Sequence, residues 1–328
     1  MNIAILQAKQ QREKVFKDVH LNQLRKHGNV VLNDSGVCTD EQMKRTIAGA
    51  DIAITSWGVQ PLTREVLDCA PDLKLVVHAA GTVKPIVTPV LWERGIRVTN
   101  CTAPLGRGVA ETALGFTISA LKNMWRLTQS SREGKWGTND RNVRELYGIT
   151  IGVISGGRAG AHYIKLLQAF EVDVLLYDPF ISAEQAAQLG ARKTELDELL
   201  VLSDVISIHA PSIPETDGMF NAERLKRMKD DCILINTARG SIIDEEALIA
   251  ELSQGRLFAC LDVTNPEPPR ADHPFRTLPN VILTPHLAGA VNNGLQRVAQ
   301  YAVDELERYL NGAKMEGEVR AEQLNMFA

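Results

Sequence analysis

The sequence predicts an α/β protein of two doubly wound, parallel-sheet domains, Rossmann-like or flavodoxin-like, with the active-site cleft between them. Three observations lead to this prediction. Short apolar, β-branched runs alternate with amphipathic helical segments along most of the chain. A glycine-rich loop lies near the middle of the sequence, between a strand and a helix. The 328 residues suffice for about two domains, each with its own core.

The central stretch reads as a strand at 149–154, a tight loop, a helix at 161–170 and a strand at 172–177. This order is typical of a mononucleotide-binding βαβ unit, in which a pyrophosphate approaches backbone amides at a helix N-terminus. The second strand ends in Asp178, at about the spacing from the glycines where an acid binds the adenosine ribose. A plain turn between strand and helix is the alternative for the loop by itself.

The loop departs from the G-x-G-x-x-G pattern at one position. Gly157 and Gly160 occupy two of the three glycine positions, but Ser155 stands where the first glycine is expected. The two glycines preserve the close phosphate approach and the packing of helix on sheet. Ser155 places a Cβ where the chain turns tightly, so we expect the loop to differ there.

Composition excludes several classes of protein. Lysine and arginine number 36 against 40 acids, which argues against a nucleic-acid surface. The first residues are too polar for a signal peptide, and no apolar run reaches the 18 residues typical of a membrane span. The five cysteines are odd in number and widely spaced, which favours reduced thiols and a cytoplasmic location.

The N-terminal part predicts one open parallel sheet, built from strands and helices in alternation. Thr39 and Thr88 are expected helix N-caps, and Pro89 suits the first helical position. The expected strands are 2–6, 30–32, 52–54, 73–77 and 96–98, and the expected helices are 15–27, 39–47, 63–69 and 88–93.

A long apolar helix at 105–127 is expected to bridge domains or subunits, and 134–147 is expected to be a polar, irregular arm. The second sheet then continues to a last helix at 295–310 and a short polar tail. Its remaining strands are expected at 205–209, 233–236, 258–263 and 281–284, with helices ending near 229 and spanning 245–252. We therefore expect a nucleotide-binding domain (102–290) inserted into a substrate domain (1–101 plus 291–328).

Charged residues follow three of the predicted strands of the second sheet: Arg239, Glu267 and His286. Ligands of α/β proteins bind beyond the carboxyl ends of strands. An arginine matches a carboxylate bidentately and polarises a neighbouring carbonyl, while a histidine exchanges protons near neutral pH. A carboxylate beside the histidine favours the imidazolium and orients the ring. This set suits hydride transfer on a 2-oxo or 2-hydroxy acid.

Each of these residues also has a simpler interpretation. Arg239 alone would fit a surface loop, Glu267 a solvated charge in a proline-rich loop, and His286 a hydrogen-bonded loop histidine. Their order and context together favour catalysis. No cluster with metal-ligand spacing is found, so no metal is expected.

Six motifs occur in order: GRAG, YDP, HAPSIPET, INTARGSIIDEEAL, LDVTNPEPP and TPHLAG. Together they resemble the D-isomer-specific 2-hydroxyacid dehydrogenase family over about residues 73–309. The resemblance implies that Arg239 binds the substrate, that His286 is the acid/base and that Glu267 tunes it. It also implies NAD rather than NADP, because Asp178 would face a 2′-phosphate. The implied cofactor contacts are Gly157, Arg158, Ala159, Gly160, Asp178, His209, Ala210, Thr237, Ala238, Asp262 and Gly289.

The family's substrate-side loop usually reads G-x-G-V-D-N, whereas this chain has Ala80, Gly81, Thr82, Val83 and Lys84. Ala80, Gly81 and Thr82 are the expected substrate contacts. Lys84 replaces a usual acid, and one hypothesis is that it favours an extra anionic group on the substrate. A solvated lysine at a helix entry is the simpler alternative.

The expected function is therefore an NAD-dependent oxidoreductase acting on glyoxylate, hydroxypyruvate or a phosphoglycerate relative. The family is typically homodimeric through the nucleotide domains, which would use the helix from residue 105. We expect no C-terminal regulatory domain of the kind that some phosphoglycerate dehydrogenases carry. Two alternatives remain: an NAD(H)-sensing, corepressor-type binding protein, and a formate-type dehydrogenase, which would not need His286 as proton donor.

Overall fold

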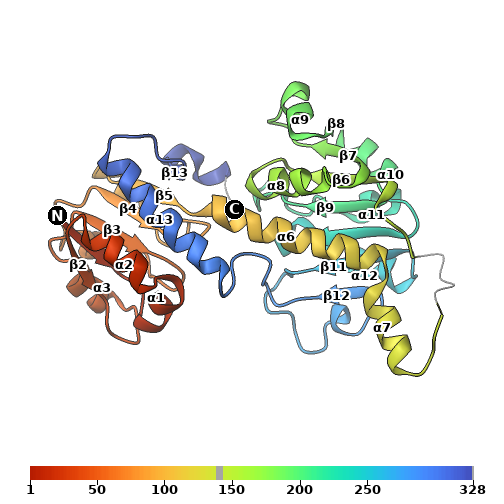
Figure 1. The fold of residues 1–328 in the computed structure, drawn as a ribbon, viewed down its shortest axis with the longest axis horizontal. Coiled ribbons are helices and arrows are strands. Elements are labelled where there is room, and N and C mark those ends of the chain that lie inside the picture. The colour runs from red at the N-terminus through yellow and green to blue at the C-terminus, as the bar shows by residue number, and fades with distance from the viewer. Residues whose placement is uncertain (138–142, 327–328) are drawn as a thin grey trace. The chain divides into compact units, whose positions relative to one another are not determined.

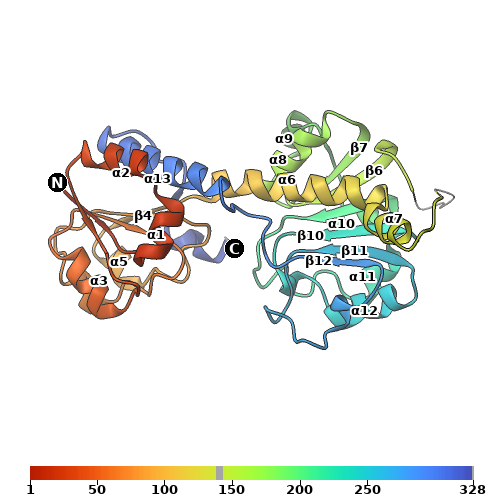
Figure 2. The same ribbon diagram turned by 60° about the horizontal axis from the view of Figure 1, so that its bottom comes forward.

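The computed structural model describes residues 1–137 and 143–326. They form two compact units, Met1–Leu105 with Ala290–Ala328 (unit 1) and Gly106–Gly289 (unit 2). Each unit is an α/β body around one sheet, seen in Figures 1 and 2, which confirms the predicted fold class. Part of the predicted arm lies outside the described residues. No helix in the described ranges has the length and apolar character needed to cross a membrane.

Unit 1 contains a six-stranded sheet in the order β13-β5-β4-β3-β1-β2. Its strands are β1 (Asn2–Ile5), β2 (Asn29–Leu32), β3 (Ile52–Thr55), β4 (Leu75–His78), β5 (Arg97–Asn100) and β13 (Glu318–Val319). Its helices are α1 (Lys9–Val15), α2 (Asp18–Arg25), α3 (Asp40–Ile47), α4 (Arg64–Leu67), α5 (Pro89–Glu93) and α13 (Gly294–Leu310), followed by a 3-10 helix, η3 (Ala321–Met326).

The apolar side chains of the unit 1 strands alternate between the two faces of the sheet. Ile3 and Ile5 pack with α1, α2 and α13, which lie side by side in Figure 1. Ala4 and Leu6 face the opposite way and pack with α3 and α4. Because both faces are covered by helices, the strands read as continuous apolar runs.

Two local expectations for unit 1 are wrong. The helix expected at 15–27 begins only at Asp18 as α2, because Phe16 and Lys17 are extended, and the separate helix α1 before it was not expected. The expected polar tail contains β13, which pairs antiparallel with β5, so the sheet is not wholly parallel. The buried carboxylate of Glu305 fixes this return, since it accepts hydrogen bonds from the Thr99 hydroxyl and, at 2.9 Å, from the Gly317 N–H.

Unit 2 contains a seven-stranded parallel sheet in the order β12-β11-β10-β9-β6-β7-β8. Its strands are β6 (Tyr147–Ile154), β7 (Glu171–Tyr177), β8 (Arg192–Lys193), β9 (Val205–Ile208), β10 (Cys232–Asn236), β11 (Leu257–Leu261) and β12 (Val281–Leu283). Its helices are α7 (Met124–Arg132), α8 (Arg158–Leu167), α9 (Ala183–Leu189), α10 (Leu196–Leu202), α11 (Ala222–Arg227), α12 (Glu245–Ser253) and the 3-10 helices η1 (Gly240–Ile242) and η2 (Pro274–Arg276). The strand order reverses between β6 and β9, which is where ligands of such sheets bind.

The long helix expected at 105–127 is two helices, α6 (Thr102–Leu121) and α7, because Asn123 adopts a left-handed conformation with φ of 49°. The boundary between the units falls within α6, after Leu105. The apolar face of α6 packs in the core of unit 2 together with α8 and α9. A buried hydrogen bond of 2.6 Å joins Thr117 of α6 to Tyr163 of α8.

Candidate active site

Every predicted residue of unit 2 lies at or beyond the carboxyl end of a strand in the parallel sheet. Arg239 follows β10, Glu267 follows β11 and His286 follows β12, and these three strands are neighbours. The glycine loop follows β6 and Asp178 follows β7. One edge of the sheet therefore carries both the predicted cofactor residues and the predicted catalytic residues.

The glycine loop leads directly into α8. Gly157 is the N-cap and offers no side-chain cap, so the first N–H groups of the helix, those of Arg158, Ala159 and Gly160, point out of its end. A Cβ on Gly160 would lie 2.0 Å from the carbonyl oxygen of Ser155, so only glycine allows the helix to approach the strand this closely. Such a terminus is suited to a phosphate group.

Ser155 stands in the left-handed region, with φ of 75°, where L-residues other than glycine are strained. Its hydroxyl makes two long contacts, 3.3 Å to Asp178 Oδ2 and 3.4 Å from the Gly157 N–H. Asp178 in turn accepts hydrogen bonds from the backbone N–H groups of Gly156 (2.9 Å) and Phe180 (2.8 Å). The predicted ribose acid therefore also fixes the shape of the loop.

We expect the substitution Ser155→Gly to raise the free energy of unfolding by about 1 kcal/mol, because glycine removes the strain of the positive φ. Denaturant unfolding of Ser155→Gly and Ser155→Ala would measure this, since alanine removes the hydroxyl but retains the Cβ. A glycine variant that is no more stable than the alanine variant would contradict the prediction.

Two buried polar atoms of the predicted cofactor residues lack a hydrogen-bond partner among the described residues: His209 Nδ1 and Thr237 Oγ1. His209 Nε2 is 2.9 Å from the Ser207 hydroxyl, and burial lowers the pKa of His209 to about 3, so the ring is neutral. Its Cβ lies 3.5 Å from the place of a Cβ on Gly160. Buried polar atoms without partners are uncommon, and a bound polar ligand would satisfy these two. They therefore fit a dinucleotide lying along this edge.

Arg239 is held by a residue that the sequence did not single out. The Asn236 side chain donates to the Arg239 carbonyl oxygen at 2.9 Å and accepts from the Ala238 N–H at 3.0 Å. Gly240 packs on the next loop so tightly that a Cβ there would lie 2.1 Å from the carbonyl carbon of Thr264. Burial lowers the pKa of Arg239, and the negative charge of Glu267 opposes this shift. A partly buried arginine thus lies within the field of the predicted glutamate.

Glu267 and His286 are in direct contact, with 2.6 Å between Glu267 Oε1 and His286 Nδ1. Both side chains are partly exposed, at 40% and 47%. Since Nδ1 is taken by the carboxylate, Nε2 is the ring nitrogen available to another molecule. The predicted pairing of a histidine with a glutamate is therefore present in the fold.

Asp262 organises the segment that carries His286. Its carboxylate is buried and accepts hydrogen bonds from the Thr284 hydroxyl (2.6 Å) and the N–H groups of Leu287 (2.9 Å) and Ala288 (2.8 Å). Its carbonyl oxygen accepts from the His286 N–H at 2.9 Å. The predicted contact of Asp262 with the cofactor stays a prediction, whereas its support of the histidine loop was not foreseen.

The remaining predicted residues are distributed over both units. Ala210, Ala238 and Gly289 belong to unit 2, where the carbonyl oxygen of Gly289 lies 2.5 Å from the place of a Cβ on Gly108 of α6. The predicted substrate contacts Ala80, Gly81 and Thr82 follow β4 in unit 1. Among the described residues, no group of three or more His, Cys, Asp or Glu residues is placed to hold a metal ion.

This fold and site define a class of protein, the α/β proteins with a dinucleotide site at the switch point of a parallel sheet. Comparison with known proteins narrows the class. The family description "D-isomer specific 2-hydroxyacid dehydrogenase, NAD binding domain" matches residues 114–288. The chain is 33% identical over 293 residues to a D-3-phosphoglycerate dehydrogenase of Archaeoglobus fulgidus, covering 89% of this chain and 55% of that protein.

Two further proteins agree with this match. A hydroxypyruvate reductase of Blautia hydrogenotrophica is 33% identical over 294 residues, which cover 87% of this chain and 90% of the reductase. The crystal structure of the TT0316 protein from Thermus thermophilus aligns with a TM-score of 0.75 at 30% identity, over 98% of this chain and all of that one. The chain spans about half the length of the phosphoglycerate dehydrogenases that it matches.

The chain belongs to the D-isomer specific 2-hydroxyacid dehydrogenase family. Unit 2 contains the NAD-binding domain of that family, and the cofactor is NAD. The resemblance that the six sequence motifs indicated is thereby confirmed.

Proposed function

We propose that the protein is an NAD-dependent dehydrogenase that interconverts a small D-2-hydroxy acid and its 2-oxo acid. Glyoxylate, hydroxypyruvate and phosphoglycerate relatives are the candidate substrates. The 2.6 Å contact between His286 Nδ1 and Glu267 Oε1 carries this proposal, because it presents an oriented imidazole at the same edge of an NAD-binding sheet as Arg239.

Each side chain has a distinct part in the proposed reaction. Arg239 would bind the substrate carboxylate with its guanidinium fork and polarise the adjacent carbonyl. His286 would give a proton from Nε2 to the carbonyl oxygen during reduction and take it back during oxidation. Glu267 would hold Nδ1 and stabilise the imidazolium. The bound nicotinamide supplies or accepts the hydride at the substrate carbon.

The proposed cofactor contacts are distributed along the same sheet edge. The helix N-terminus at Arg158 and Ala159 would bind the pyrophosphate, and Asp178 the adenosine ribose. His209 Nδ1 and Thr237 Oγ1, the buried polar atoms described above, would form hydrogen bonds with the cofactor. Ala80, Gly81 and Thr82 in the proposed substrate domain, unit 1, stay the predicted substrate contacts.

A panel of 2-oxo acids tests the proposal. We expect oxidation of NADH, followed as loss of absorbance, with glyoxylate or hydroxypyruvate, and slower turnover with NADPH because its 2′-phosphate would face Asp178. If no 2-oxo acid is reduced but NADH binds, a cofactor-sensing protein is the better interpretation. Oxidation of formate without pH-dependent reductase activity would instead favour the formate-type alternative.

The same panel tests the hypothesis on Lys84, whose side chain is exposed after β4. If Lys84 binds an extra anionic group, Lys84→Ala lowers kcat/KM for phosphorylated substrates relative to plain 2-oxo acids. If the ratio of kcat/KM for phosphorylated and plain substrates does not change, Lys84 is a solvated surface lysine that does not bind the substrate.

We further propose that the protein is a cytoplasmic homodimer. All five cysteines are unpaired, which supports a reducing compartment. In unit 2, α7 buries none of its side chains: Met124 and Trp125 of this helix are exposed at 46% and 38%, and Trp136, which follows it in sequence, is exposed at 94%. Large apolar side chains exposed together are typical of a surface that another chain covers.

A further inference from the structure

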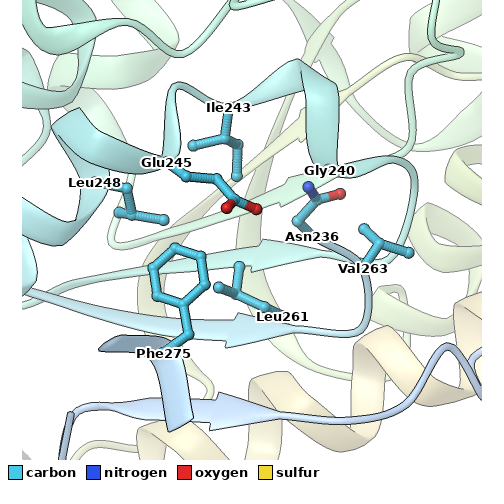
Figure 3. Close-up of a pocket in the computed structure, with 8 residues that line it drawn as sticks. All are labelled: Asn236, Gly240, Ile243, Glu245, Leu248, Leu261, Val263 and Phe275. Atoms are coloured by element: carbon cyan, nitrogen blue, oxygen red, sulfur yellow. The ribbon is translucent and has the colours of Figure 1, made fainter. Parts of the chain in front are cut away.

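Glu245 is the first residue of α12, and its carboxylate points into a small recess below the carboxyl ends of β10 and β11, shown in Figure 3. The recess is mainly apolar, with Ile243, Leu248, Leu261, Val263 and Phe275 in its lining. Only 14% of the Glu245 side chain is exposed, and burial raises the pKa of its carboxyl group. A carboxylate in such surroundings depends on polar partners.

Glu245 has two such partners, and both come from the segment after β11. Glu245 Oε1 accepts a hydrogen bond of 2.8 Å from the backbone N–H of Asn265. Glu245 Oε2 lies 3.2 Å from Nε2 of His273, whose side chain is 11% exposed. His273 Nδ1 accepts from the Phe275 N–H at 3.3 Å, which leaves Nε2 to donate to the carboxylate. Glu245 thus connects α12 to two points of this segment.

The peptide that Glu245 holds adjoins both Glu267 and Arg239. Asn265 precedes Glu267 by two residues, with Pro266 between them. The same peptide packs directly against Gly240, because a Cβ on Gly240 would lie only 2.6 Å from the Asn265 nitrogen. Gly240 directly follows Arg239. A displacement of the 264–265 peptide would therefore move the proposed substrate arginine and the proposed glutamate together.

We propose that Glu245, oriented by His273, is a positioning residue that sets the places of Glu267 and Arg239. This inference rests on the dehydrogenase function proposed above. Buried ionic groups can often be replaced together by well-packed apolar residues without loss of stability, so folding stability alone does not explain a carboxylate at this place. Glu245 accepts a hydrogen bond from a proline-rich segment, in which few backbone N–H groups are available to fix the position of the chain.

Three variants test the role of Glu245: Glu245→Ala, Glu245→Gln and the matched control Glu246→Ala. Glu246 is the next residue of the same helix turn and is exposed. We expect Glu245→Ala to lower kcat by about 10- to 100-fold, because a displacement of about 1 Å in a catalytic group has effects of this size. The Kd for NADH should not change. Glu245→Gln should give activity between that of Glu245→Ala and that of the wild type, since its amide oxygen can still accept the Asn265 N–H but its NH2 group faces the Nε2–H donor of His273.

Hydrogen–deuterium exchange supplies a readout that needs no substrate. Within the segment 265–270, only Asn265, Glu267 and Arg270 carry a backbone N–H, because the other three residues are prolines, and a peptide that begins at least two residues before Asn265 reports its exchange. We expect faster exchange in this peptide for Glu245→Ala, and wild-type exchange for Glu245→Gln and Glu246→Ala.

The outcomes separate the two proposals. A wild-type protein that reduces no 2-oxo acid would overturn the proposed function, whatever the exchange shows. If the wild type is active, unchanged exchange in Glu245→Ala would overturn the positioning role alone. The same conclusion would follow if kcat of Glu245→Ala matched that of Glu246→Ala, or if glutamine failed to rescue a folded variant.

Discussion

Replacing His286 by alanine is expected to lower kcat for 2-oxo acid reduction by about 100- to 10,000-fold, the usual contribution of a positioned acid or base. The ring is lost, but the loop that carries it is held by backbone groups on the buried Asp262. The cofactor site should therefore persist, with an unchanged Kd for NADH. Steady-state kinetics and a fluorescence titration with NADH measure the two quantities.

His27 offers a matched control for this substitution. Its Nε2 lies 3.0 Å from Glu307 in unit 1, so it forms a similar pair of ring and carboxylate with no proposed part in the reaction. His27→Ala should keep kcat near the wild-type value. Turnover by His286→Ala at the level of His27→Ala would show that the acid/base assignment is wrong.

The second large effect is expected for Arg239→Lys, with kcat/KM for the 2-oxo acid reduced by about 100-fold or more. Lysine retains the positive charge but has no planar fork to bind a carboxylate bidentately while polarising the carbonyl. Because substrate binding is affected, KM should rise as kcat falls. The Kd for NADH should stay within about twofold.

Arg224→Lys is a suitable comparison for Arg239→Lys. Both arginines lie in unit 2 and donate from the guanidinium to a backbone carbonyl oxygen, Arg239 to that of Ala238 at 2.6 Å and Arg224 to that of Met219 at 2.8 Å. Lysine at 224 should leave the kinetics unchanged. If lysine at 239 did the same, Arg239 would not be the bidentate substrate ligand.

Local chemistry explains which elements the sequence predicted well. Thr39 caps α3, and its hydroxyl accepts from the Gln42 N–H at 3.4 Å as the capping pattern requires. Pro89 begins α5. The sequence did not show the extended break at 16–17 or the left-handed Asn123, because neither position carries a proline or a glycine.

The sequence predicted the charged residues of the proposed site but not the residues that hold them in place. Arg239, Glu267 and His286 could be found because each follows an apolar run in a parallel sheet, and such ends meet at one edge. The support of these residues could not be found in the same way. Asn236 and Glu245 act through backbone groups of loops, and those contacts depend on how neighbouring loops pack after the strands have paired.

The antiparallel pairing of β13 with β5 has a consequence for how the chain is made. Unit 1 draws its sheet from residues near both ends, and Glu305 joins Thr99 to Gly317 across that distance in sequence. During synthesis the whole of Gly106–Gly289 emerges before the last strand of unit 1 exists. Domains fold as units once their residues are available. The cofactor-binding body can thus fold on the ribosome before β13 is made, whereas unit 1 completes its sheet only after β13 has been synthesised.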